Sequence, residues 1–441
     1  MRDLVVATLL LGSIPFILRQ PFIGLLVWVV FGILNPHQFA WGWALSIPFG
    51  QLVAGATILS ILIHARQRYP FPLNGITVTM IVFLIWLGVS PLFSFHPEGE
   101  WSLWLRAFKI QLMVLLGLLV VGTREQLHKL TWALALSVGF YGIKGGIFTI
   151  ATGGGSRVYG PENSFISDNN SLALTIIMAV PLFRYLQLQA KKRWVKLACG
   201  AAMLLSVASA LGSQSRGALL ALAAMAALLW WKGRSKAMIG LLIVIAIPII
   251  YVSMPESWMA RMNTIQTYDQ DASAMGRINA WWMAWHLAID RFPIGGGFDI
   301  YEPDVFARYA PDAFDIHAAH SIYFQVLGEH GFFGLFLFVS LFLLAWRCGS
   351  WVLRNVRGRE DLLWARDLAA MCQVSLVGYV IGGTFLSLSY FDLPYYIVAV
   401  LVALREVVRK ELAKSTKQDK ADKADKALAG GTTVAASAGR P

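Results

Sequence analysis

Long apolar runs separated by short basic loops dominate this 441-residue chain. A membrane-spanning helix needs about 20 mainly apolar residues, and the chain holds enough such runs for about a dozen. Only 14% of its residues are charged, against about 25% in an ordinary soluble domain. The runs are continuous rather than alternating, which excludes a transmembrane β-barrel. The sequence therefore predicts an all-α polytopic integral membrane protein.

Two apolar runs open the chain, at residues 4–18 and 21–34. No small-residue cleavage site separates them, so we interpret them as membrane segments and not as a removable signal peptide. Eleven further runs follow: 48–63, 76–93, 105–121, 127–150, 171–188, 195–211, 217–231, 237–252, 322–346, 368–385 and 393–404. We therefore predict 12 or 13 transmembrane helices, because the first two runs are short enough to form one broken pair.

The distribution of basic residues predicts the orientation. One alternate set of loops, together with the C-terminal tail, carries 24 Lys and Arg residues, whereas the other set carries six. Basic loops stay on the cytoplasmic side, so the first set is expected in the cytoplasm and the second outside. We assign the net charge of +12 to this membrane asymmetry and expect no nucleic-acid partner.

This pattern divides the chain into four regions. An N-terminal transmembrane bundle of about ten spans covers residues 1–253. A large outer loop with amphipathic helices covers 254–320, and C-terminal transmembrane helices cover 321–405. The tail, 406–441, contains a Lys-Ala-Asp repeat and is poor in large apolar residues after about Glu411, so we expect it to be disordered and cytoplasmic.

The outer loop is rich in aromatic residues. Its segment 276–290 (GRINAWWMAWHLAID) predicts a helix with Trp281, Trp285 and Ala288 on one face. We expect this helix to lie on the membrane surface with its tryptophans at headgroup depth. Anchoring alone does not explain Arg277 at the helix start. The guanidinium fork suits a phosphate, although a solvated arginine is an equal alternative.

The loop closes with Asp312, Asp315, His317 and His320 just before the next span. A histidine at the mouth of a helix can titrate near neutrality and act as a general base. The alternative is an interfacial histidine held by hydrogen bonds. The four side chains also have spacings found among metal ligands. Nothing else in the spacing closes a ligand set, so we predict no metal site.

Several cations lie near the predicted outer ends of the helices, either in the spans or in the adjoining loops. Charges inside a membrane are costly and usually face a polar cavity. A helix N-terminus next to an arginine also favours anions, although snorkelling to the interface is the alternative. We therefore expect one outward-facing basic cavity for an anionic lipid headgroup or diphosphate. Its predicted members are Arg106, Lys109, Lys144, Arg157, Arg216 and Arg277.

Two acidic residues are candidates for supporting roles. Asp168 begins an Asp-Asn-Asn run typical of a helix N-cap. It ends a Gly-rich loop, 152–168, whose glycines form either plain turns or an anion cradle. Glu329 lies in the outer half of its span, where it is expected to pair with one of the cations.

Four motifs follow one another along the chain: SQSRG (213–217), GRINAWWMAW (276–285), IGGGF (294–298) and AHSIYFQVLGEHGFFG (319–334). In this order they resemble the O-antigen ligase and O-antigen polymerase superfamily. The N-terminal segments LNPHQFAWGWA (34–44) and 139–170 resemble the branch containing O-antigen ligases and the exosortase-associated O-glycosylation ligases. The resemblance covers about residues 1–405.

The resemblance implies a cofactor-free, metal-independent, inverting glycosyltransferase of the bacterial inner membrane. Its active site would face the periplasm, and its donor would be a glycan on undecaprenyl diphosphate. The family histidine of the AHN-type motif corresponds to His320, with Ser321 in place of the usual Asn, and family arginines correspond to Arg216 and Arg277. We expect a hydroxyl of lipid A–core as acceptor.

Other functions share much of this pattern. A protein O-oligosaccharyltransferase or an O-antigen polymerase would use the same lipid-linked donor. A lipid or glycan transporter would also be a polytopic bundle, but it would be expected to show repeated halves and polar residues at the bilayer midplane. Here the polar residues gather at one end of the predicted spans, which favours a transferase.

Overall fold

The computed structural model describes residues 1–232, eleven residues between 236 and 259, and residues 272–437, with side chains described as far as residue 415. Over this part the chain is all-helical, with fourteen α-helices, several short 3-10 turns and no strand. The expected span 237–252 falls largely outside the described residues. The all-helical class predicted from the apolar runs is confirmed.

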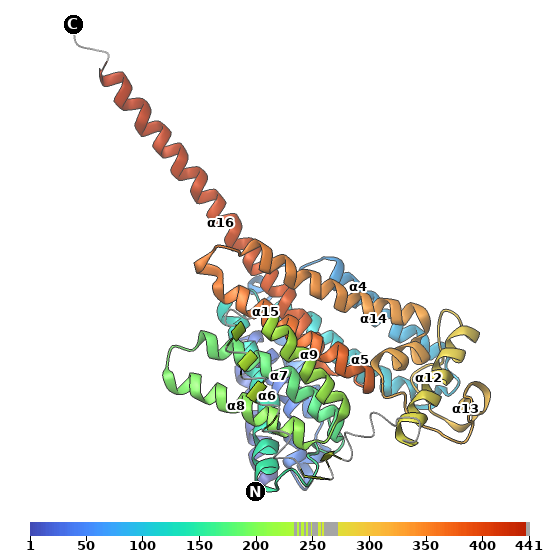
Figure 1. Cartoon of the computed structure of the whole chain (residues 1–441). Coiled ribbons are helices and arrows are strands. Elements are labelled where there is room, and N and C mark those ends of the chain that lie inside the picture. The colour runs from blue at the N-terminus through green and yellow to red at the C-terminus, as the bar shows by residue number, and fades with distance from the viewer. Residues whose placement is uncertain are drawn as a thin grey trace.

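The helices form one elongated bundle (Figure 1). Their bounds are α1 Arg2–Arg19, α2 Pro21–Leu34, α3 Phe49–Ile63, α4 Gly75–Val89, α5 Pro97–Gly117, α6 Arg124–Ala151, α7 Asn169–Gln189, α8 Arg193–Gly212, α9 Arg216–Lys232, α12 Ala272–Asp290, α13 Pro303–Tyr309, α14 Ile322–Asn355, α15 Leu363–Gly382 and α16 Asp392–Ser437.

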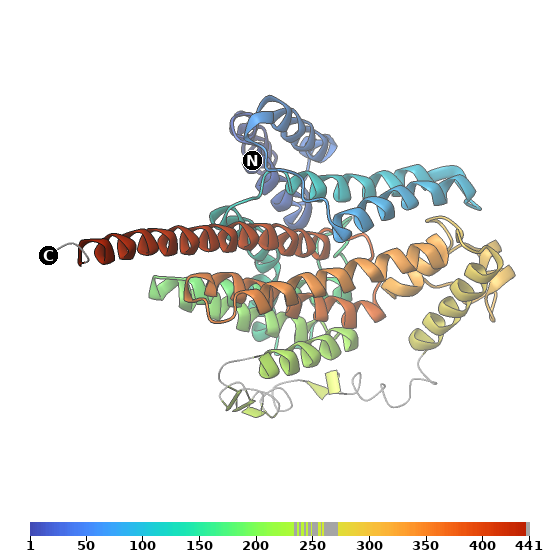
Figure 2. The ribbon, with the colours of Figure 1, turned by 90° about the horizontal axis from the view of Figure 1, so that it is seen from above.

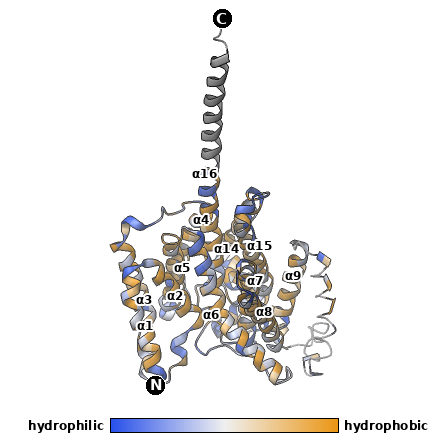
Figure 3. Ribbon diagram, turned by 90° about the vertical axis from the view of Figure 1, so that its left-hand side faces the viewer, coloured by the Kyte–Doolittle hydropathy of each residue, from blue (hydrophilic) through white to orange (hydrophobic). Residues whose placement is uncertain are grey.

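Six helical segments of the described chain are long and apolar enough to cross a membrane. They are Gly75–Phe93, Arg124–Ala151, Asn169–Gln189, Arg193–Gly212, Ile322–Asn355 and Glu360–Phe385, and three shorter apolar helices accompany them. Apolar residues cover most of the bundle (Figure 3). These segments fit a polytopic membrane protein, while the number of 12 or 13 spans stays a prediction.

Several of these helices begin directly after a residue whose side chain caps the helix. Asn74 caps α4 by accepting hydrogen bonds from the amides of Ile76 and Thr77. The Asp168 side chain caps α7 by accepting from the amides of Asn170 and Ser171, at 2.9 and 3.0 Å. The N-cap predicted for the Asp-Asn-Asn run is therefore confirmed, because its carboxylate satisfies amides that have no partner within the helix.

Small residues bring α6 and α8 into close contact. A Cβ at Gly146 would overlap the backbone of Leu205, and one at Gly142 would overlap the side chain of Ser206. Such contacts are typical of membrane helices, whose association depends on close packing rather than on expulsion of water. Helix α7 packs on both members of this pair, and α15 packs in turn on α7.

The segment between α12 and α14 forms a small unit at one end of the bundle (Figures 1 and 2). Its own core combines Met283 and Leu287 of α12 with Ile300, Val305 and Phe306 of the following loop and α13. The face of α12 that includes Gly276, Ala284 and Ala288 is also buried, and α12 packs against α14. The helix predicted over 276–290 is confirmed.

The tail differs from our expectation of disorder. Helix α16 continues from Asp392 to Ser437, and its C-terminal part extends well beyond the bundle (Figure 1). Lys, Ala, Glu and Gln have high helix propensity, and Lys and Asp recur at spacings that place opposite charges on neighbouring turns. A segment that cannot form a core can therefore still adopt a helix.

Candidate functional site

The segment that carries the predicted histidines is held against α12 by hydrogen bonds to Asn279. The Asn279 side-chain amide donates to the carbonyl oxygens of Asp312 and Asp315, at 2.8 and 2.9 Å. Its oxygen accepts from the Asp312 amide at 2.9 Å. Three of the four hydrogen bonds that this buried side chain can form are thus used to hold one loop. Asn279 therefore places the loop beside the helix that carries Arg277.

Trp281 fixes the next part of this segment. Its indole Nε1 donates to the carbonyl oxygen of Ala319 at 2.6 Å, and its ring stacks on Phe324 with centroids 5.0 Å apart. The Trp281 ring therefore faces α14 and the histidine segment, whereas the position of this helix at headgroup depth stays a prediction. Trp282 and Trp285, in contrast, are 50% and 40% exposed.

His320 lies between these fixed points in an unusual backbone conformation. Its φ is 43°, in the left-handed region that non-glycine residues seldom adopt. The side chain is half-buried. Burial and, secondarily, the charge of Arg277 lower its pKa below the ordinary 6.5, although Asp168 opposes them. The imidazole is therefore neutral at neutral pH, the form in which it can accept a proton.

His317 lies against the start of α12. Its Nδ1 is 2.8 Å from a carboxylate oxygen of Asp315, and a Cβ at Gly276 would meet its ring at 2.7 Å. The glycine before Arg277 thus leaves room for the imidazole. Among the described residues, no group of three His, Cys, Asp or Glu side chains is placed to hold a metal ion.

A second junction brings three more of the predicted residues near one another. The Asn169 side chain donates to the carbonyl oxygen of Ser213 at 2.7 Å, which ties the start of α7 to the loop before α9. In that loop the Gln214 side-chain oxygen accepts from Arg157 Nε at 3.3 Å. Arg216 follows as the first residue of α9. Arg157, Asp168 and Arg216 are therefore neighbours through this junction.

The electrostatic influence of Asp168 on His320 connects this junction with the α12 segment. Three predicted residues, Asp168, Arg277 and His317, thus influence the pKa of His320. Arg157 and Arg216 belong to the junction that also contains Asp168.

Arg106 and Lys109 line a different cavity of about 210 Å³ between α2, α5, the 165–166 segment and the start of α16. The lining residues of this cavity include Asp392 but not Arg157, Arg216 or Arg277. Lys144 is exposed on α6. Of the six cations that we expected in one basic cavity, only Arg106 and Lys109 line this one.

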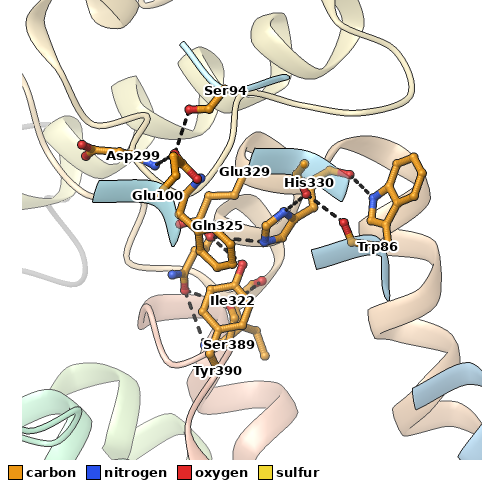
Figure 4. Close-up of polar contacts among 12 residues, drawn as sticks. Trp86, Ser94, Glu100, Asp299, Ile322, Gln325, Glu329, His330, Ser389 and Tyr390 are labelled. Carbon is orange, nitrogen blue, oxygen red and sulfur yellow. Dashed lines mark hydrogen bonds and ion pairs between the residues drawn. The ribbon is translucent and has the colours of Figure 1, made fainter. Parts of the chain in front are cut away.

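Glu329 has other partners than the cations we expected. Tyr390 donates to its carboxylate at 2.5 Å, and His330 Nε2 lies 3.8 Å away. The other nitrogen of His330 is 2.6 Å from the Ser90 hydroxyl. Figure 4 shows these side chains in one buried polar network between α14, α4 and the 389–390 turn. The expected pairing with a basic residue is replaced because α14 turns Glu329 into the bundle.

A second buried carboxylate in Figure 4 holds the Gly-rich segment. Glu100, which is 0% exposed, accepts from the amides of Phe298 and Asp299, both at 2.9 Å, and from the Ser94 hydroxyl at 2.8 Å. The amides of Gly296 and Gly297 donate to the carbonyl oxygens of Gly328 and Glu329. These carbonyls are accessible because α14 breaks at Gly331, whose φ is 67°.

The motif reasoning missed the roles of Asn279, Glu100 and Ser94. Asn279 lies within the quoted GRINAWW motif, and a polar side chain on the apolar face of an amphipathic helix is the signal that identifies it. Glu100 and Ser94 offer no comparable signal. The backbone partners of Glu100 are about 200 residues away in the chain, and only the packing of α5 against the loop reveals them.

The fold and this site are those of a helical protein suited to a membrane, with a half-buried histidine near Arg277. Residues 201–339 match the model of the family described as O-Antigen ligase, and this range includes Arg216, Arg277 and His320. This part of the chain is therefore similar to the O-antigen ligase family, which confirms the resemblance that its motifs indicated. Residues 1–191 match a family of unknown function, DUF5935. No curated protein matches the chain.

Proposed function

We propose that the chain is an O-antigen ligase-type glycosyltransferase of the bacterial inner membrane. It transfers a glycan from undecaprenyl diphosphate to a hydroxyl of lipid A–core on the periplasmic face, without a metal ion and with inversion at the anomeric carbon. The ligase domain supports a ligase or polymerase function. The N-terminal resemblance favours the ligase.

The match of residues 201–339 to the O-antigen ligase family, together with the half-buried position of His320 within this range, carries the proposal. Burial and Arg277 lower the pKa of the His320 imidazole, so the ring can remove the proton from an acceptor hydroxyl. The oxygen then forms a bond to the anomeric carbon. The bond from that carbon to the diphosphate breaks, and undecaprenyl diphosphate leaves with the electron pair. Attack opposite the leaving group inverts the configuration.

The arginines supply the charge that this leaving group requires. Arg216 and Arg277 would bind the diphosphate and stabilise the negative charge that develops on it, with Arg157 beside them through Gln214. The start of α9 at Arg216 adds the partial positive charge of a helix N-terminus. Asp168 and His317 would orient the site. Lys144, exposed on α6, stays a predicted contributor.

A transfer assay with purified protein in detergent tests the proposal. It supplies undecaprenyl-diphosphate-linked glycan and lipid A–core in the presence of EDTA. We expect glycan on lipid A–core with the wild type, no turnover with His320→Ala, and unchanged donor binding in that variant. His286→Ala is the matched control, because His286 lies on α12 but binds the Tyr309 carbonyl oxygen instead. Near-normal turnover by His320→Ala would refute the assignment of the base.

Donor binding without transfer would contradict lipid A–core as acceptor. The same donor would then be tested with a protein acceptor and with a second lipid-linked glycan, which are the acceptors of an O-oligosaccharyltransferase and of a polymerase. Arg216→Gln and Arg277→Gln are expected to weaken donor binding itself, in contrast to His320→Ala.

A further inference from the structure

The cavity that contains Arg106 and Lys109 has the features of a second anion site. Both cations lie on α5, three residues apart, so they share one face of the helix. The Arg106 guanidinium lies 3.7 Å from the centre of the Phe165 ring, which restricts its orientation. The remaining walls are mostly apolar, with Trp28, Phe31 and Phe391 among them. A small ionic head attached to a hydrocarbon body fits such a space.

The charges in this cavity do not cancel. Asp392 is the acidic residue in its lining, and it offsets one of the two cations. Among the described residues, Lys109 forms no ion pair, and Asp392 lies beyond ion-pair distance of Arg106. One positive charge is thus left in a largely apolar space. An arginine fork next to a lysine suits the oxygens of a phosphate group.

The cavity is close to the proposed catalytic histidine. Ile166 lines the cavity, and Asp168, two residues later, acts on the charge of His320. Two residues of extended chain span at most about 7 Å. A molecule bound by a phosphate in this cavity would therefore lie next to the segment whose Asp168 influences the pKa of His320.

We propose that this cavity binds a phosphate group of the acceptor lipid, with Arg106 and Lys109 as its ligands. The acceptor role rests on the proposed transferase function, whereas the binding itself does not. The site would favour a phosphorylated lipid acceptor over a protein side chain, because a protein hydroxyl carries no phosphate for the two cations to bind.

Binding of lipid A to the delipidated full-length protein, measured by native mass spectrometry without any donor, tests the site. Lipid A with its phosphates is compared with lipid A from which the phosphates have been removed. We expect the phosphorylated form to bind the wild type at least tenfold more tightly. Equal binding of the two forms would overturn the proposal. Inorganic phosphate at 10 mM is expected not to displace the lipid, and full displacement would identify free phosphate as the ligand instead.

The variant Arg106→Gln/Lys109→Gln is expected to lose this tenfold preference. Its matched control is Arg193→Gln/Lys196→Gln, which removes the same pair of residue types at the same spacing from exposed positions on α8. The control should retain the preference. Loss of the preference in both variants, or in neither, would contradict a specific site.

A variant with the opposite expected effect on lipid binding keeps the test decisive if the double variant does not fold. Asp392→Asn removes the negative charge beside the phosphate, so phosphorylated lipid A should bind several-fold more tightly. Weaker or unchanged binding would count against the site. In the transfer assay, the double variant should raise KM for lipid A–core and leave KM for the donor unchanged. An increase in the donor KM alone would assign these cations to the donor diphosphate.

Discussion

The indole Nε1 of Trp281 donates a hydrogen bond to the carbonyl oxygen of Ala319, the residue directly before His320. The same indole stacks on Phe324, two residues after the start of α14. One side chain thus contacts the chain on both sides of His320. This arrangement holds a backbone with positive φ, a conformation that persists only where the surroundings impose it.

We predict that Trp281→Phe lowers kcat about tenfold with little change in donor binding. Phenylalanine preserves the ring stack but removes the donor to Ala319, and a hydrogen bond contributes roughly 0.5–1.5 kcal/mol, which corresponds to up to about tenfold in rate. Steady-state kinetics with separate kcat and KM values measure this effect. Trp282→Phe, at an exposed position, is the control. An equal loss in both variants would argue against a positioning role for Trp281.

The pH dependence of kcat/KM should report the pKa of His320 and the effect of Arg277 on that pKa. The neutral imidazole is the active form, and its lowered pKa means that activity should fall only as the pH drops below 6.5. Arg277→Gln removes a positive charge that disfavours protonation, so the acidic limb should move up towards 6.5. Profiles of both proteins measure the shift. Arg308→Gln, which loses a surface pair with Asp290, should leave the limb in place.

We expect Glu100→Gln to destabilise the protein by about 1–3 kcal/mol, the usual cost of leaving buried polar groups without partners. Three donors point at this carboxylate, and an amide can satisfy them only in part. The thermal unfolding midpoint in detergent measures the loss. Glu98→Gln changes an exposed carboxylate two residues earlier and should leave the midpoint unchanged.

Gly331→Ala should lower the free energy of unfolding by roughly 2–5 kcal/mol, because Gly331 forms the break in α14. Its positive φ disfavours any L side chain by about 1–2 kcal/mol, and a Cβ there would overlap the carbonyl group of Pro293, which adds an overpacking cost of about 1–3 kcal/mol. Chemical or thermal unfolding measures this change. In α1, a Cβ at Gly12 meets no atom within 4 Å, so Gly12→Ala should be neutral or slightly stabilising. A neutral Gly331→Ala would refute the tight contact.

The apolar runs and cap residues predicted much of the local structure. Helix α7 begins at the Asp168 cap and α12 covers the 276–290 segment, because amide capping and amphipathic periodicity depend on residues close in the chain. The motifs also identified Arg216, Arg277 and His320, which lie in the matched ligase domain. The roles of these residues and the membrane orientation remain predictions.

What the sequence by itself determined is the helical class, several helix starts and the types of residue available for chemistry. Only the tertiary structure decided which of them meet. Asp168 and His320 are 152 positions apart, and Glu100 and Phe298 are 198 apart. It also placed Arg106 and Lys109 in a cavity of their own. Sequence spacing describes neighbours on one helix, whereas contacts between distant segments depend on how whole helices pack.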